Sequence, residues 1–256
     1  RYNGVQLLDD TVRPNFWRAP TNNDEGCAEP FEFAFWKTAG LYARCDALTA
    51  ETKGEFVTVH ANYTLPDGQT LPIDFAIDGA GRCDITMTWQ GERAEVPEFG
   101  LLFQLRRELT EVSYLGLGPR ETTADRTAGG KMGAWSYNVR QDFAQNSPVY
   151  PQECGSRTDV YRAALTGSIP GIGFAGDGMT FSALPYTPHE LENARHLYEL
   201  PRDDNKTIVR CAAFQRGVGG DNSWGAKPHA DTCFAVEKGT AFHFLVQKSN
   251  YRNVHF

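Results

Sequence analysis

Concentrated positive charge and long apolar runs are both missing from this sequence. Its 256 residues include 25 Lys and Arg against 32 Asp and Glu, which gives a formal net charge of −7. Nucleic acid is not an expected partner, because phosphate binding needs clustered cationic side chains. A membrane-spanning helix is not expected either, because it needs a run of about 18 or more apolar residues. The remaining composition, 41% hydrophobic and 22% charged, is that of an ordinary globular chain that can bury a core.

The six cysteines form neither a C-x-x-C pair nor a cluster with histidine at zinc-ligand spacing. Disulfide frameworks and zinc sites usually have tighter patterns, so we expect no metal site and free, mostly buried thiols. Such thiols persist in a reducing compartment, which predicts a cytoplasmic protein. The chain begins without Met, a basic segment or an apolar segment. We therefore expect no signal peptide, and we expect the sequence to be a piece of a longer protein.

Several short catalytic motifs are absent as well. The sequence has no G-x-S-x-G nucleophile elbow and no H-E-x-x-H zinc motif, and the glycines of 217–220 lack the G-K-[ST] ending of a phosphate loop. His189 and His196 lie seven residues apart, which is not the spacing of a helical metal pair, so we expect structural roles for them. The 32 acidic residues leave a glycosidase carboxylate pair open, but no local pattern selects one.

Period-two patterns separated by turn residues predict antiparallel strands. In one such segment Cys83, Ile85, Met87 and Trp89 share a face. Strands are predicted at 55–65, 69–78, 82–90, 100–109, 206–214, 231–236 and 240–247.

Helical patterns are few. Segments 188–200 and 29–40 have apolar residues at helical spacing and are the two predicted helices. The stretch 115–170 is predicted to be largely irregular, and loops of this length usually serve a function or are covered by a larger assembly. No repeat or linker divides the chain. We therefore expect a single all-β domain, a large sandwich, over residues 1–256.

Three turn-rich clusters combine aromatic and polar residues, at 15–26, 114–126 and 217–228. Sugar sites are built in this way, with an aromatic ring against the apolar side of the pyranose and planar polar groups on its hydroxyls. The same composition also fits structural turns with internal salt bridges. The third cluster, GVGGDNSWGAKP, is unusual because its glycines and Asn/Asp residues give no reason to bury the large ring of Trp224.

Taken in order, these clusters resemble the C-terminal domain of the large bacterial β-galactosidases of glycoside hydrolase family 2. The matching segments are FWRAPTNNDEG, YLGLGPRETTADR, YPQECGSRTDV, FSALPYTPHELENARHLYEL and GVGGDNSW. The resemblance implies a large antiparallel β super-sandwich related to galactose mutarotase. It also implies that the catalytic acid/base and nucleophile lie in a TIM barrel that precedes this region. No glutamate of this chain is therefore expected to be catalytic, and the region alone is expected to be inactive.

The resemblance assigns roles to particular residues. Trp224 corresponds to the tryptophan whose ring forms a substrate platform at the active-site mouth, especially for the sugar in the leaving-group position. Gly26 corresponds to the hinge of a mobile loop over 27–36, although the loop sequence is this chain's own. The expected supporting residues of the loop and turn are Asn23, Asp24, Asp221 and Asn222.

Other motif residues are expected to hold the fold. Arg18 with Asp24, and Glu121 with Arg126, are predicted buried ion pairs. Glu153 and Arg157 lie where a mutarotase-like fold could keep a vestigial sugar pocket. No cofactor is expected in this region, because the Mg²⁺ and monovalent cation of the parent enzyme would be bound mainly by other domains. The expected partners are a β-galactoside such as lactose, the catalytic barrel and other copies of the full enzyme.

Two other functions remain open from the sequence. A stand-alone carbohydrate-binding module would bind sugar without further domains. An aldose mutarotase-like enzyme would need a histidine and a glutamate in one pocket, for which His189 and Glu153 are candidates by residue type only.

Overall fold

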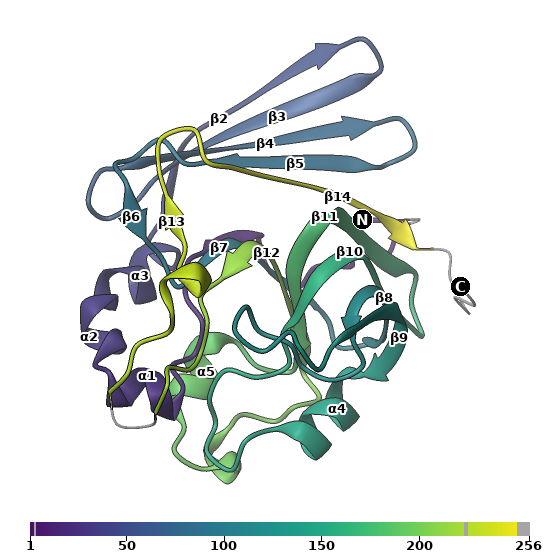
Figure 1. Ribbon diagram of the computed structural model, residues 1–256. Coiled ribbons are helices and arrows are strands. Elements are labelled where there is room, and N and C mark those ends of the chain that lie inside the picture. Colours follow the sequence, from purple (N-terminus) through teal and green to yellow (C-terminus); the bar gives the residue numbers. More distant parts are fainter. Residues whose placement is uncertain (3, 223–224, 250–256) are drawn as a thin grey trace.

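The computed structural model describes residues 1–2, 4–222 and 225–249, which are built around one twelve-stranded antiparallel sheet (Figure 1). Its main path runs through β1 Arg13–Asn15, β7 Glu98–Arg106, β12 Lys206–Gln215, β11 Gly171–Leu184, β14 Ala241–Ser249, β5 Cys83–Thr88, β4 Thr70–Asp78, β3 Phe56–Thr64 and β2 Arg44–Lys53. A branch from β11 continues through β10 Arg157–Gly167, β8 Leu109–Gly118 and β9 Lys131–Asn138. A separate small sheet pairs β6 Ala94–Glu95 with β13 Ala235–Val236. The prediction of a large all-β antiparallel fold is confirmed.

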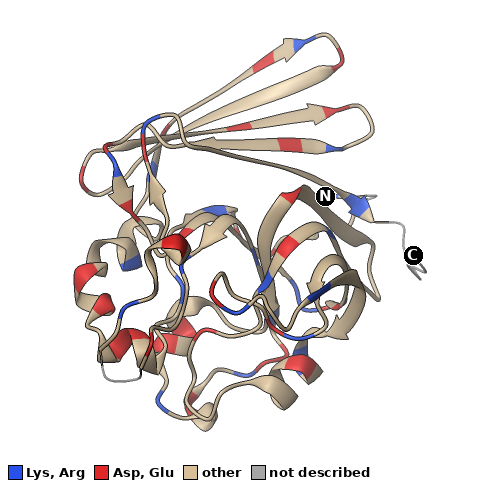
Figure 2. Ribbon diagram, viewed as in Figure 1, with Lys and Arg blue, Asp and Glu red and all other residues tan. Residues whose placement is uncertain are grey.

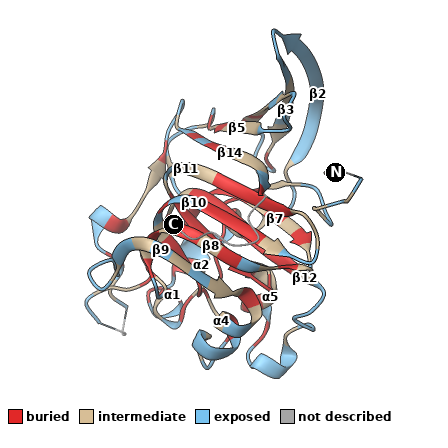
Figure 3. Ribbon diagram, turned by 90° about the vertical axis from the view of Figure 1, so that its right-hand side faces the viewer, coloured by how far each residue is buried: buried red, intermediate tan, exposed pale blue. Residues whose placement is uncertain are grey.

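The core lies against the central strands, where buried residues concentrate (Figure 3). The predicted face of β5 is confirmed, since Ile85, Met87 and Trp89 are buried and Cys83 is half-buried. The ring centroids of Trp89 and Phe16 lie 6.1 Å apart, so the first cluster and the sheet share one core. Alternation of apolar and polar residues therefore places one face of the sheet inward, as a period of two requires.

Two regions differ from the sequence prediction. Most of 231–236 is not a strand, because Ala230–Thr232 forms a 3₁₀ turn in which Thr232 donates both its N–H and its hydroxyl to the His229 carbonyl. Only the last two residues pair, as β13. The stretch 115–170 is not irregular, because it holds the end of β8, all of β9 and β10, and the helix α4 Val139–Asn146.

Glycines conceal these strands in the sequence. At Gly118 an added Cβ would lie 2.2 Å from the Tyr114 hydroxyl oxygen, so a glycine lets the strand pass close to that ring. In β10 the register shifts around Asp159, which has a positive φ of 50°. Bulges and close approaches require residues that composition assigns to loops.

The predicted helices are present but shorter. Segment 188–200 contains α5 Pro188–Asn193 and a 3₁₀ turn at Leu197–Glu199, separated where Ala194 becomes extended. Segment 29–40 divides at Phe33 into α2 Glu29–Glu32 and α3 Ala34–Ala39. The helix α1 Asn22–Gly26 precedes them. Among the described residues no helix is long and apolar enough to cross a membrane.

The cysteine prediction is confirmed in part. All six thiols are free. Cys27, Cys154 and Cys211 are buried, whereas Cys45 is exposed and the other two are intermediate.

Candidate functional site

The first cluster begins α1 with a capping box. The Thr21 hydroxyl accepts from the Asp24 N–H at 3.3 Å, and the Asp24 carboxylate accepts from the Thr21 N–H at 2.6 Å. This reciprocal pair satisfies two N–H groups that the first turn of a helix leaves free. The pattern T-x-x-D therefore fixes the position of Asp24 before any long-range contact is made.

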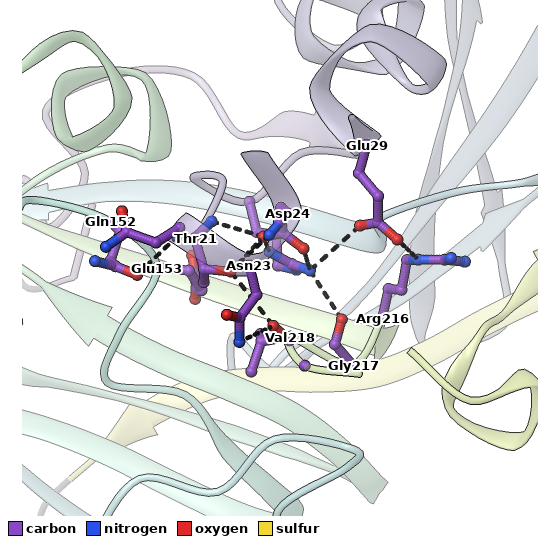
Figure 4. A network of polar contacts seen from close by, with 12 residues as sticks. Thr21, Asn23, Asp24, Glu29, Gln152, Glu153, Arg216, Gly217 and Val218 are labelled. Carbon is purple, nitrogen blue, oxygen red and sulfur yellow. Dashed lines mark hydrogen bonds and ion pairs between the residues drawn. The ribbon is translucent and has the colours of Figure 1, made fainter. Parts of the chain in front are cut away.

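Arg18 joins the first cluster to the third. It forms a buried ion pair with Asp24, its Nη2 lying 2.9 Å from Asp24 Oδ1, and the same nitrogen donates to the Gly217 carbonyl at 2.9 Å (Figure 4). Burial by itself would raise the pKa of Asp24, but the charge and hydrogen bonds of Arg18 outweigh it and hold that pKa below its usual value. The predicted buried ion pair is confirmed.

The second cluster reaches the same segment through Asp125. Its Oδ2 accepts from the N–H groups of Val218 at 3.0 Å and Gly219 at 2.8 Å, and its Oδ1 accepts from the Thr123 hydroxyl at 2.7 Å. One carboxylate therefore binds two successive backbone donors at the start of the third cluster. Its sequence signal was only that of an acid in a turn-rich segment, so no role was predicted for Asp125.

Further bonds fasten the same point. The Thr21 hydroxyl and the Asn23 side-chain amide both donate to the Val218 carbonyl, at 3.3 and 3.4 Å (Figure 4). Gln152, from the matching segment YPQECGSRTDV, accepts from the Asn22 N–H at 3.2 Å. Residues of the first cluster thus contact 217–219, which lies about 200 positions further along the chain. The contact of Asn23 with Val218 is consistent with a position that supports this turn.

Gly220 closely approaches Ala226 and Lys227, and we call this close approach the neck. A Cβ on Gly220 would lie 2.3 Å from the Ala226 carbonyl oxygen, so only glycine fits there without backbone movement. Next to the neck, Asp221 Oδ1 accepts from His229 Nε2 at 2.7 Å, and this bond raises the pKa of His229. Both side chains are exposed. Trp224 lies outside the described residues, and Asn222 is exposed beside Asp221 in the same bend.

Gly26, the predicted hinge, is the last residue of α1. A Cβ on Gly225 would lie 3.4 Å from the Gly26 carbonyl oxygen, so the far end of the third cluster passes beside this position. Gly26 and Gly225 are therefore neighbours in the folded chain.

Glu29, at the start of α2, fastens the predicted mobile loop to the sheet. Its Oε1 accepts from Arg216 Nε at 2.8 Å, and Arg18 Nη2 lies 3.9 Å from its Oε2 (Figure 4). Acidic residues gather on α1 and α2 (Figure 2). Burial, followed by the hydrogen bond and charge of Asp24, raises the pKa of Glu29 to about 7, against the opposing effect of both arginines. Glu29 and Arg216 were not among the predicted site residues.

The raised pKa of Glu29 predicts a stability change near neutral pH. The folded protein holds this proton more tightly than the unfolded chain, so the contribution is complete below about pH 4.5 and is lost as pH rises through about 7. We expect urea unfolding to show a loss on the order of 1–3 kcal/mol between pH 5 and pH 8. Glu29→Gln should flatten this change. Glu32→Gln, at an exposed position of the same helix, should leave it in place, and an unaltered slope in Glu29→Gln would contradict the assignment.

The remaining predicted pairs are less uniform. Glu121 and Arg126 form an ion pair, but the Arg126 side chain is 56% exposed, so the prediction that this pair is buried was wrong. Arg157 lines a cavity of about 580 Å³ and lies 3.2 Å from Asp142. Glu153 is buried elsewhere, paired with Arg210. Of the two residues of the predicted vestigial pocket, Arg157 lines this cavity and Glu153 does not.

His189 and Glu153, the two candidates of the mutarotase alternative, have different hydrogen-bond partners. His189 Nε2 lies 2.7 Å from the Lys37 carbonyl oxygen, whereas Glu153 accepts from Gln215 at 3.1 Å and Ser156 at 3.0 Å in the core. In the part of the chain that the structure describes, no group of three or more His, Cys, Asp or Glu side chains is arranged to hold a metal ion.

Comparisons with known proteins agree with the ordered motifs. The model of a family described as β-galactosidase small chain matches residues 1–246. A β-galactosidase from Lactobacillus delbrueckii subsp. bulgaricus is 36% identical over 253 residues, which cover 96% of this chain and 25% of the relative. A β-galactosidase small subunit from Latilactobacillus sakei is 30% identical over 281 residues, covering 95% of this chain and 86% of the relative. Among solved structures, a galactose 1-epimerase from Lactobacillus acidophilus NCFM matches with a TM-score of 0.40 and 8% identity, over 78% of this chain and 64% of its own. This chain spans about a quarter of the length of the first of these relatives.

Proposed function

This chain belongs to the β-galactosidase small chain family, and we propose that it forms one region of a β-galactosidase whose catalytic carboxylates lie elsewhere in the protein. The whole enzyme would hydrolyse terminal non-reducing β-D-galactosides such as lactose with retention, through a covalent galactosyl intermediate. The observation that carries the proposal is the convergence of the three clusters on 217–219 in a chain that matches this family over 1–246. The region is proposed to be one domain over 1–256 and inactive by itself.

The proposed role of the region is to complete the mouth of the active site. Arg18, Asp125 and the Gly220 neck hold the base of a loop that presents Trp224 to the sugar in the leaving-group position. An indole ring suits this task because its face covers the apolar side of a pyranose. The segment 27–36 is proposed to open and close beside it, with Gly26 as hinge and Glu29 fastening it to Arg216.

The other assignments follow from the same proposal. The region would need no cofactor of its own, and the Mg²⁺ and monovalent cation of the whole enzyme would be bound mainly by other domains. Its partners would be the catalytic barrel, the substrate and further copies of the enzyme. The six free thiols support a reducing compartment such as the cytoplasm.

The test is Trp224→Ala in the whole β-galactosidase. We expect kcat/KM for lactose to fall about ten-fold, because one stacked ring contributes roughly 1.4 kcal/mol. Trp224→Phe should recover part of this loss. Tyr198→Ala, at an exposed ring outside the proposed site, should not change the kinetics.

Unchanged kinetics in Trp224→Ala would refute the platform. Absence of galactosidase activity in the native protein would refute the enzyme assignment. Sugar binding by this chain would then favour a binding module, and faster mutarotation of fresh galactose, followed by polarimetry, would favour a mutarotase.

A further inference from the structure

Strands β2 to β5 form a four-stranded antiparallel meander that extends beyond the body of the molecule, and we call it the wing (Figure 1). The register of the wing with β14 aligns apolar side chains in rows across the sheet, because paired residues share a face. One row consists of Ala50, Val59, Phe75, Ile85 and Phe244. The neighbouring rows contain Leu48 on one side, and Val57 and Ile77 on the other.

The opposite face of the wing is polar. His60 pairs with Asp74 at 2.7 Å and approaches Glu51 at 3.6 Å, and His243 approaches Asp84 at 3.4 Å. The wing is therefore an amphipathic antiparallel sheet, with one face suited to water and one suited to a core.

Only part of the apolar face is covered. In the row described above, Phe244 and Ile85 are buried, Phe75 and Val59 are half-buried and Ala50 is exposed. Beyond it, Leu48 is 68% exposed, Val57 42% and Ile77 38%, and the whole of β2 is exposed (Figure 3). Along this face the apolar side chains change from buried to exposed, and no polar residue separates the two groups within the row. A contiguous apolar surface of this kind marks a contact with another protein surface.

The residues at the edge of the wing favour contact through the apolar face of the sheet over pairing of β2 with a strand of another protein. The outer strand β2 carries Arg44, Asp46, Glu51 and Lys53, and its register shifts between Cys45 and Ala47. Charged residues and bulges are the features by which edge strands resist pairing with another strand.

We propose that the wing face, formed by Leu48, Ala50, Val57, Val59, Phe75 and Ile77, binds the remaining part of the same β-galactosidase. This inference rests on the proposed function. It is supported by the lengths of the relatives, since this region is 25% of one of them and a separate small subunit in another. The occupant is an apolar surface of the remainder, whether that remainder is the same polypeptide or a large subunit. The wing and the three-cluster site lie at different ends of the molecule, so the remainder contacts this region at two separated places (Figure 1).

Thiol labelling of the native enzyme tests the proposal. Leu48→Cys places a thiol on the wing face, and Thr49→Cys places one on the opposite face of the same strand. Both positions are exposed in this chain, so they form a matched pair. The exposed Cys45 is replaced by Ser in both variants. We expect maleimide to label Leu48→Cys at least ten-fold more slowly than Thr49→Cys. Ile77→Cys provides a second position if Leu48→Cys does not fold.

A photo-crosslinking residue at Leu48 identifies the occupant. Attachment to peptides from outside this region supports the proposal. Attachment to the wing of another copy would overturn it, as would equal labelling of the two thiols or protection of both. Lactose hydrolysis by the untreated enzyme is measured in parallel. Activity with a freely labelled Leu48→Cys would reject the docking surface and keep the proposed function, whereas a native protein without activity would reject the function itself.

Discussion

Arg210→Met is expected to lower the free energy of unfolding by about 3–5 kcal/mol, because it leaves two buried carboxylates without their cation. Arg210 is buried, with Nη1 2.8 Å from Glu98 Oε2, Nη2 paired with Glu153 and Nε donating to the Ser182 hydroxyl at 3.1 Å. Burial, followed by the charge of Glu153, already raises the pKa of Glu98 to about 6 against the opposing effect of Arg210. Without the arginine that pKa rises further. The folded variant then takes up protons more readily, so its loss of stability should be larger at pH 8 than at pH 5.

Urea unfolding at both pH values measures this effect. A triple variant that adds Glu98→Gln and Glu153→Gln should recover part of the loss, because no charge then remains buried without a partner. Arg202→Met, at a side chain that is 88% exposed, should change stability by less than about 0.5 kcal/mol. A cost below about 1 kcal/mol for Arg210→Met, or no recovery in the triple variant, would show that this cluster does not hold the strands together.

Gly220→Ala is expected to lower kcat/KM of the whole enzyme by about 10- to 100-fold, because small displacements of a substrate-binding group have effects of this size. An added Cβ would lie 2.3 Å from the Ala226 carbonyl oxygen and 2.6 Å from that of Lys227. Backbone atoms stand on the opposing side, so the neck itself has to open. Trp224, the proposed platform, lies between Gly220 and Ala226 in the sequence, so we expect this change to displace it.

The neighbouring glycine is the matched control. A Cβ on Gly219 would lie 3.4 Å from Asn23 Nδ2, a side-chain atom that can yield, so Gly219→Ala should keep most of the activity. If Gly220 acts through the tryptophan, Gly220→Ala combined with Trp224→Ala should be no worse than Trp224→Ala alone. An equal loss in both glycine variants would point to a general effect of the loop rather than to the neck.

Local patterns predicted the parts of the site that depend on neighbours in the chain. The Arg18–Asp24 pair and the turn at 15–26 could be anticipated because the paired residues are only six positions apart in a turn-rich segment. Asp125 and Arg216 could not, because their partners lie 93 and 187 positions away and nothing nearby distinguishes them from surface charges. For Glu121 and Arg126, the short sequence spacing correctly predicted an ion pair, but it did not predict that Arg126 would be exposed.

Local patterns were sufficient to predict the all-β fold class and six of the fourteen described strands, because alternation and turn chemistry act over a few residues. The six are β3, β4, β5, β7, β12 and β14. Tertiary structure alone decided which segments of 115–170 become strands, because their glycines are explained only by the rings and backbones that pass beside them. The tertiary structure also brings the first and second clusters into contact with 217–219. It leaves the outer apolar side chains of the wing exposed. Burial and long-range pairing depend on which surfaces come together in the folded chain, and a local sequence pattern does not specify those surfaces.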